Sequence, residues 1–155
     1  MDFFLFSTPL GQMGLAADGE LGAITRLYLP SDPVPRLMPH ATPLLERGRE
    51  QLLDYLSGLR RDFDLPLAPE GTPFQQQVWA QLRRIPWGET RSYAQLARAV
   101  DCPKGFRAVG MANSRNPIPI LIPCHRVIGT NGFPGGYIGG PELKKALLRL
   151  EGHNF

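Results

Sequence analysis

The chain has 155 residues, a formal net charge of +3 and a hydrophobic content of 43%. This composition is typical of a globular chain with a hydrophobic core, and no apolar run is long enough to span a membrane. The apolar N-terminus lacks a basic leader and a small-residue cleavage site, so we expect a strand there and not a signal peptide. Two cysteines, Cys102 and Cys124, are too few for a disulfide scaffold, and we expect free thiols in a reducing, cytoplasmic environment.

Charge is distributed unevenly along the chain. Residues 1–70 carry six Arg and ten acidic residues, a net charge of −4, whereas residues 71–155 carry eleven basic and four acidic residues, a net charge of +7. A basic half of this size suits a polyanionic partner, although a solvated basic surface explains the charge equally well. Cys124 and His125 are adjacent and cannot easily face one ion, so we expect no metal and no cofactor.

The first half predicts a small sheet followed by a helix. Short apolar segments separated by turn signals predict strands over residues 2–7, 12–17 and 23–29. A proline-rich, irregular connector covers residues 30–43. A helix begins at Thr42 with proline after it and stops near Ser57. Residues 62–67 alternate as an edge strand would, interrupted by Pro66.

A boundary near residues 68–71 divides the chain into an N-terminal α/β domain, 1–70, and a mostly helical C-terminal domain, 71–155. In the second domain Thr72 precedes a helix that ends near residues 85–88. Ser92 and Gln95 form the pattern of a capping box that opens a short helix. A turn and a further helix over residues 104–114 follow. This pair inside a basic segment is typical of a helix-turn-helix, although paired helices are also common in any core.

The last third holds one reactive side chain between regular elements. A buried apolar run over residues 118–122 leads to Cys124, and a glycine-rich loop over residues 129–140 precedes a final helix over residues 141–151. A thiolate is the nucleophilic form of cysteine, and the neighbouring His125 and Arg126 favour it. Adjacent side chains point apart on an extended chain, and a buried cysteine is often plain core, so this pair alone favours a structural interpretation.

The wider motif changes that interpretation. The sequence Asn-Pro-Ile-Pro-Ile-Leu-Ile-Pro-Cys-His-Arg-Val over residues 116–127 closely resembles the active-site signature of the O6-alkylguanine-DNA alkyltransferase family. The resemblance covers roughly residues 72–153 and includes Arg-Ala-Val-Gly at 107–110, Tyr-Ile-Gly-Gly at 137–140, Lys144 and Leu-Glu-Gly-His at 150–153. Residues 1–70 resemble the variable N-terminal domain of that family more loosely.

The resemblance implies direct-reversal DNA repair in which an alkyl group moves irreversibly from the O6 of guanine to Cys124, once per molecule. His125 corresponds to the base that takes the thiol proton through a water molecule, and Glu151 to the carboxylate that orients it. Because the lesion is stacked inside the duplex, the nucleotide must first be turned out. The resemblance gives Arg107 the place of the residue that fills the gap. Tyr93 corresponds to the residue that crowds the 3′ phosphate and protonates the leaving guanine.

Asn116 matches the hinge between the recognition helix and the cysteine loop. The further DNA contacts that we expect are Lys104, Ser92, Arg115 and Arg126, and the pocket residues are Tyr137, Ile138, Gly139 and Val127. Many relatives carry Ser where this chain has Ile138. Lys144 matches the family pattern, but a surface helix lysine explains it equally well.

The resemblance implies double-stranded DNA carrying O6-alkylguanine as the partner, no membrane, and a monomer whose cooperativity along DNA stays open. Three alternatives remain. An alkyltransferase-like protein binds lesions but lacks the acceptor cysteine that this chain has. A helix-turn-helix regulator would not need the Pro-Cys-His-Arg motif, and a Cys-His hydrolase would need an oxyanion motif that we do not find.

Overall fold

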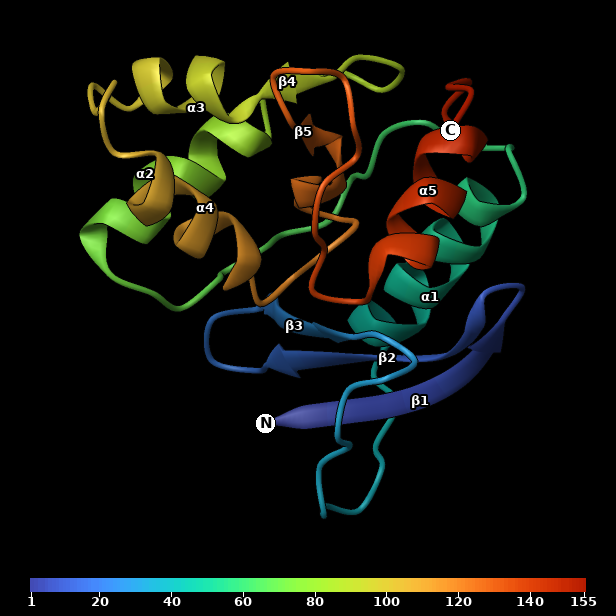
Figure 1. Cartoon of the computed structure of the whole chain (residues 1–155). Helices are drawn as coiled ribbons and strands as arrows, with labels where there is room; N and C mark the ends of the chain where they lie inside the picture. The colour runs from blue at the N-terminus through green and yellow to red at the C-terminus, as the bar shows by residue number, and fades with distance from the viewer. The chain divides into compact units, whose positions relative to one another are not determined.

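A computed structural model describes all 155 residues, which form two compact units, Met1–Glu70 and Gly71–Phe155 (Figure 1). The fold is of the expected mixed α/β class, with a small antiparallel sheet and five α-helices. None of these helices is long and apolar enough to cross a membrane.

The first unit is a three-stranded antiparallel sheet covered by one helix. Its strands are β1 (Asp2–Thr8), β2 (Gly11–Asp18) and β3 (Ala23–Tyr28), in the spatial order β1-β2-β3, and the helix is α1 (Pro43–Leu56). The Thr42 hydroxyl accepts a hydrogen bond from the Leu45 N–H and caps α1, as the sequence predicted. A Cβ at Gly48 would lie 2.7 Å from the Leu15 side chain, so only glycine allows α1 to approach the sheet this closely.

The expected edge strand over residues 62–67 is absent, and this prediction is wrong. Only an isolated bridge joins Leu67 to Ile24 in β3, where the Ile24 N–H donates to the Pro66 carbonyl. Pro66 has no N–H with which to continue a ladder. Instead, the Gln51 side chain accepts a hydrogen bond from the Asp64 N–H at 2.9 Å and donates one to the Asp64 carbonyl at 3.3 Å. These two bonds hold the segment against α1.

The second unit is mostly helical. It contains α2 (Pro73–Leu82), α3 (Tyr93–Ala99), α4 (Phe106–Ser114), α5 (Pro141–Leu150), the 3₁₀ turn η1 (Cys124–Arg126), and a parallel pair of two-residue strands, β4 (Arg91–Ser92) and β5 (Val127–Ile128). Both predicted capping boxes form, Thr72 with Gln75 and Ser92 with Gln95. The buried Trp79 indole donates to the Ala112 carbonyl at 2.9 Å and joins α2 to α4.

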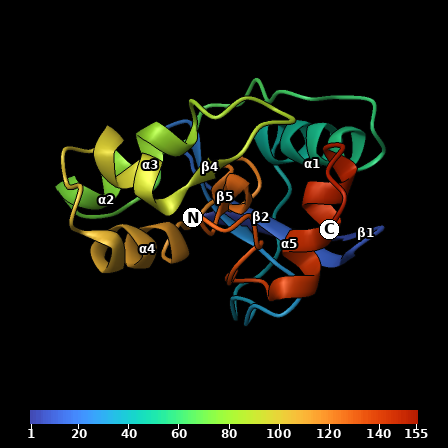
Figure 2. The ribbon, with the colours of Figure 1, turned by 45° about the horizontal axis from the view of Figure 1, so that its top comes forward.

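The predicted helix pair is α3 and α4, which pack against each other (Figure 2). A tight turn joins them, in which Asp101 adopts a positive φ of 55° and the Cys102 N–H donates to the Ala97 carbonyl. α4 begins at Phe106, two residues after the predicted start at Lys104, because the turn extends through Gly105. This arrangement leaves the outer side of α4 exposed.

Candidate active site

The cysteine loop is fixed by one buried asparagine. Asn116 accepts a hydrogen bond from the Ile118 N–H at 3.0 Å and donates to the Ile122 carbonyl at 2.8 Å. Within this loop Ile120 adopts a positive φ of 72°, which is unfavourable for a β-branched residue and is stabilised by its burial. The Cys124 N–H then donates to the Ile122 carbonyl, and η1 begins. Asn116 therefore ties the end of α4 to the turn that carries Cys124.

The residues after Cys124 converge on one carboxylate. The Nε2 atom of His125 lies 2.8 Å from Oε2 of Glu151, which is the C-cap residue of α5. The guanidinium of Arg126 donates to both oxygens of the same carboxylate, at 2.8 and 2.9 Å, and to the Ile85 carbonyl at 2.6 Å. All three side chains are buried. Because Arg126 compensates the charge of Glu151, the carboxylate can remain ionised in the core and orient the imidazole.

Burial sets the protonation states of the cysteine and the histidine. Desolvation raises the pKa of the Cys124 thiol to about 11, against the opposing effects of Asn116, Lys144 and Tyr137. Desolvation also lowers the pKa of His125, and the neighbouring Glu151 opposes that shift. At neutral pH the thiol therefore holds its proton, while the imidazole is neutral and able to accept one. An imidazole that donates from Nε2 to Glu151 has Nδ1 as its basic nitrogen.

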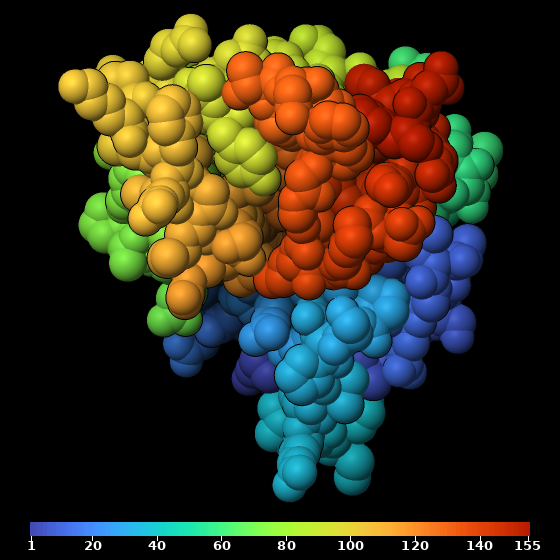
Figure 3. Space-filling view, viewed as in Figure 1, coloured from blue at the N-terminus to red at the C-terminus, as the bar shows by residue number.

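Cys124 lies in a cavity of about 320 Å³. The space-filling view shows the surface hollowed between the gold-orange atoms of α4 and the orange-red atoms of the loop over residues 129–140 (Figure 3). The lining residues are Tyr93, Gly110, Asn113, Ser114, Cys124, Gly136, Tyr137 and Ile138. Cys124 is thus buried at a concave site of the size that small ligands occupy.

Tyr93 and Asn113 form another polar part of the cavity wall. Tyr93 is the first residue of α3, and burial raises the pKa of its hydroxyl, an effect to which Cys124 adds. The Asn113 side chain opposes this rise of the Tyr93 pKa, and its Nδ2 lies 3.5 Å from the Cys124 carbonyl. Tyr93 therefore keeps its proton at neutral pH and can donate it to a group in the cavity.

Lys144 is not the surface lysine that its helical position allowed, and that interpretation is wrong. Its side chain is fully buried, and its ammonium donates to the Val127 carbonyl at 2.6 Å and to the Gly136 carbonyl at 3.1 Å. Burial lowers the pKa of Lys144 to about 8. The two hydrogen bonds join α5 to β5 and to the glycine-rich loop, so Lys144 holds the loop wall of the cavity.

The residues expected to contact DNA differ in how far they are exposed. Lys104, Arg107 and Arg115 are exposed on or beside α4, and Ser92 is half-buried with its hydroxyl capping α3. Arg126 is the exception, and its predicted contact with DNA is wrong. It is 6% exposed and bound to Glu151, so it stabilises the carboxylate and is not available to a phosphate.

The predicted pocket residues need a similar correction. Tyr137 and Ile138 line the cavity, but Val127 and Gly139 do not. Val127 is fully buried. Gly139 lies in a turn in which the Gly140 N–H donates to the Tyr137 carbonyl. Four further residues line the cavity and were not predicted from the sequence, namely Gly110, Asn113, Ser114 and Gly136. The first three recur three and four positions apart in α4, a signal that identifies the inner face of a helix once one lining residue is known.

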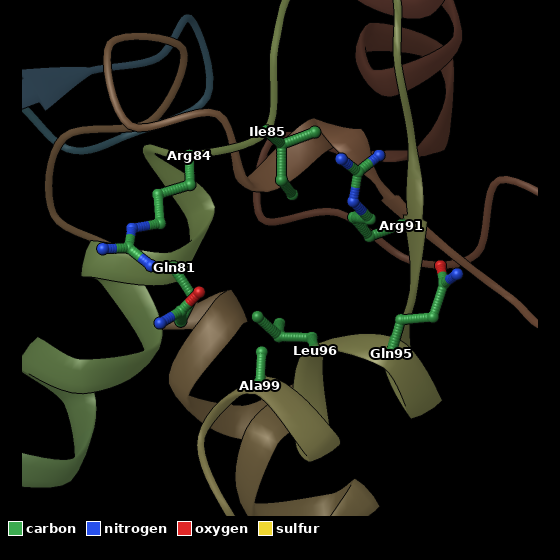
Figure 4. Close-up of a pocket in the computed structure, with 7 residues that line it drawn as sticks. All are labelled: Gln81, Arg84, Ile85, Arg91, Gln95, Leu96 and Ala99. Carbon is green, nitrogen blue, oxygen red and sulfur yellow. The ribbon is translucent and has the colours of Figure 1, made fainter.

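A second cavity of the same unit, about 310 Å³ in volume, lies between the end of α2 and α3 (Figure 4). Its lining residues are Gln81, Arg84, Ile85, Arg91, Gln95, Leu96 and Ala99. None of these side chains is a nucleophile or a general base at neutral pH. The chemistry-bearing side chains therefore concentrate in the Cys124 cavity.

Comparison with known proteins identifies the family. The family described as 6-O-methylguanine DNA methyltransferase, DNA binding domain, matches residues 73–153. The constitutive methylated-DNA–protein-cysteine methyltransferase of Bacillus subtilis is 47% identical over 152 residues, covering 93% of this chain and 91% of that protein. The methylated-DNA–protein-cysteine methyltransferase of Methanosarcina acetivorans is 43% identical and covers 98% and 99%.

A solved structure agrees with these sequence relatives. The crystal structure of Mycobacterium tuberculosis OGT in complex with DNA superimposes with a TM-score of 0.89 at 40% identity, covering 97% of this chain and 92% of that one. The match thus extends over both units of the chain. Together with the Pro-Cys-His-Arg turn and its buried carboxylate, these similarities show that the chain belongs to the methylated-DNA–protein-cysteine methyltransferase family.

Proposed function

We propose that this chain repairs DNA carrying O6-alkylguanine by taking the alkyl group onto the sulfur of Cys124, once per molecule. The observation that carries the proposal is the cavity of about 320 Å³ with Cys124 in its wall, followed in the chain by His125, which is buried against Glu151. A thiol that is protonated at neutral pH needs such a base to become a nucleophile.

In the proposed reaction Nδ1 of His125 takes the thiol proton through a water molecule. The thiolate attacks the alkyl carbon, a carbon–sulfur bond forms, and the bond between that carbon and the guanine O6 breaks. Glu151 stabilises the imidazolium through the hydrogen bond of 2.8 Å. The electron pair of the broken bond leaves on guanine, which Tyr93 protonates, because its hydroxyl still carries its proton. The thioether has no leaving group that water displaces, so the protein is consumed.

We propose that unit Gly71–Phe155 both binds DNA and accepts the alkyl group. Exposed cations at Lys104, Arg107 and Arg115 suit the phosphates of a double-stranded partner. Arg107 enters the base stack where the target nucleotide is turned out, and Ser92 and Tyr93 contact the strand beside it. The protein acts as a monomer and binds one lesion. It works in a reducing compartment with access to chromosomal DNA, such as the cytoplasm, because a disulfide at Cys124 would block the reaction.

The deciding experiment is incubation of the protein with a duplex that contains one O6-methylguanine. We expect the peptide with Cys124 to gain one methyl group and the product to reach about one equivalent of protein, by the stoichiometry of covalent capture. Cys124→Ala should transfer no methyl group yet retain DNA affinity, because phosphate contacts supply most of that affinity. The matched control is Cys102→Ala, which alters the half-buried cysteine outside the cavity. Methyl transfer by Cys124→Ala would refute the proposal, and so would lesion binding by the unaltered chain without any modification of Cys124.

A further inference from the structure

The first residue of α4 is an exposed phenylalanine. Phe106 is 51% exposed and directly precedes Arg107, whose side chain is exposed as well. A single exposed apolar side chain is ordinary on a protein surface. The position of Phe106 relative to the Cys124 cavity gives this one its significance.

Phe106 lies on the cavity-facing side of its helix. An α-helix turns by about 100° per residue, so positions 106, 110 and 113 share one face. Gly110 and Asn113 line the cavity. Phe106 continues this face by one turn toward the start of α4, and no side chain at position 110 separates it from the cavity wall. Met111, the other large exposed apolar residue of α4, lies outside this face.

The charges around Phe106 favour a nucleic acid as its partner. Lys104 and Arg107 are exposed on either side of it, and the first turn of α4 contains no acidic residue. A polyanion that these cations attract would cover the phenyl ring as well. Of the common polyanions, nucleic acids offer flat apolar faces, on their bases, on which an aromatic ring can stack.

We propose that Phe106 is a second residue that holds the duplex open during base extrusion. Its ring packs against the base or deoxyribose next to the target nucleotide, while Arg107 occupies the vacated position. This inference rests on the proposed entry of Arg107 into the stack. Apolar side chains in DNA grooves can separate neighbouring bases in this way. Because Phe106 lies on the cavity side of Arg107, it contacts the strand whose base enters the cavity.

The test compares duplex and single-stranded substrates of one sequence, each with one O6-methylguanine. Second-order rate constants for methyl transfer are measured for the unaltered chain, Phe106→Ala, Phe106→Leu, Arg107→Ala and Met111→Ala. Phe106→Ala should lower the rate on the duplex on the order of tenfold, as expected for the loss of one aromatic stacking contact, and should leave the single-strand rate little changed. Phe106→Leu should retain part of the duplex rate, and Met111→Ala should leave both rates little changed. Thermal melting checks that each variant is folded.

Equal losses on both substrates would overturn the proposal, because they would assign Phe106 to the pocket or to stability. A duplex loss in Met111→Ala as large as that in Phe106→Ala would also overturn it, by indicating a general apolar contact. If Arg107→Ala lowers the ratio of the duplex rate to the single-strand rate and Phe106→Ala does not, the role of Phe106 is refuted and the proposed function stands. Absence of methyl transfer in the unaltered chain would refute the proposed function itself.

Discussion

Replacement of Glu151 by glutamine tests how the thiolate of Cys124 forms. The change removes the negative charge that orients His125. It also replaces one acceptor oxygen with an amide that donates, although its neighbours His125 and Arg126 are themselves donors to the carboxylate. A pKa of about 11 leaves only about one thiol in 10⁴ ionised at pH 7. Without a competent base the variant must use this fraction. General base catalysis typically contributes about 10²–10⁴-fold, so we expect a loss of at least about 10²-fold at pH 7.

The pH dependence gives the sharper result. Each unit of pH raises the spontaneous thiolate fraction tenfold until the pH approaches the pKa of the thiol. The loss in Glu151→Gln should therefore shrink steadily from pH 7 to pH 10, because the pKa of the buried Cys124 thiol is raised to about 11. A thiol with the reference pKa of about 8.5 would instead recover fully by that pH, which is what the sequence alone predicts.

The assay is the second-order rate constant for methyl transfer from a single-lesion duplex, measured at each pH. Glu142→Gln is the matched control, because Glu142 lies in the first turn of the same helix with an exposed carboxylate. Loss of the charge opposite Arg126 leaves a buried cation, which typically costs about 3–5 kcal/mol, so thermal melting must show that the variant is folded at each pH. A loss that stays constant from pH 7 to pH 10 in folded protein would refute the role of Glu151 in thiolate formation.

Three further substitutions test other parts of the site. Arg107→Ala should slow repair of a duplex much more than reaction with the free alkylated base, which needs no extrusion, and equal losses would show that Arg107 does not enter the stack. Ile138→Ser should speed reaction with O6-benzylguanine several-fold relative to methylated duplex, because the serine hydroxyl can donate to the guanine oxygen in the transition state. One such donor contributes at most about 3–4 kcal/mol. Unchanged or slower benzyl transfer would place position 138 outside the reaction path. Lys144→Met should lower the free energy of unfolding by about 1–3 kcal/mol, because the buried Val127 carbonyl loses its donor, and should speed hydrogen exchange of the loop over residues 133–140. Unchanged melting and exchange would show that Lys144 does not hold that loop.

Much of the fold followed from local signals in the sequence. Thr42, Thr72 and Ser92 each cap a helix where the pattern predicted one, because N-capping depends on residues within one turn. The segment around Pro66 was mispredicted, since its backbone groups bind the Gln51 side chain, a contact between residues distant in sequence. The alternation of polar and apolar residues does not reveal that a side chain will occupy the backbone groups that a strand would pair.

Within the site, the sequence predicted Cys124, His125 and Glu151 as the reactive residues but did not predict how they are buried. Nothing local distinguishes Arg126 from the exposed arginines of the basic half, and its partner Glu151 lies 25 positions away. Lys144 likewise depends on carbonyls of β5 and the glycine-rich loop. The raised pKa of Cys124 has the same origin, because desolvation comes from the packed surroundings as a whole. Properties that depend on tertiary packing thus needed the structure.

The 3₁₀ turn Cys124–Arg126 also limits how this protein can evolve. A 3₁₀ helix has about three residues per turn, so its successive side chains point in three different directions. One direction here leads to the cavity, and the other two lead to the buried Glu151. Insertion or deletion of one residue would rotate the thiol into the core and a charged side chain into the cavity. Descendants of this chain can therefore vary the composition of the flanking loop, but a change of length within the turn would remove the reaction in one step.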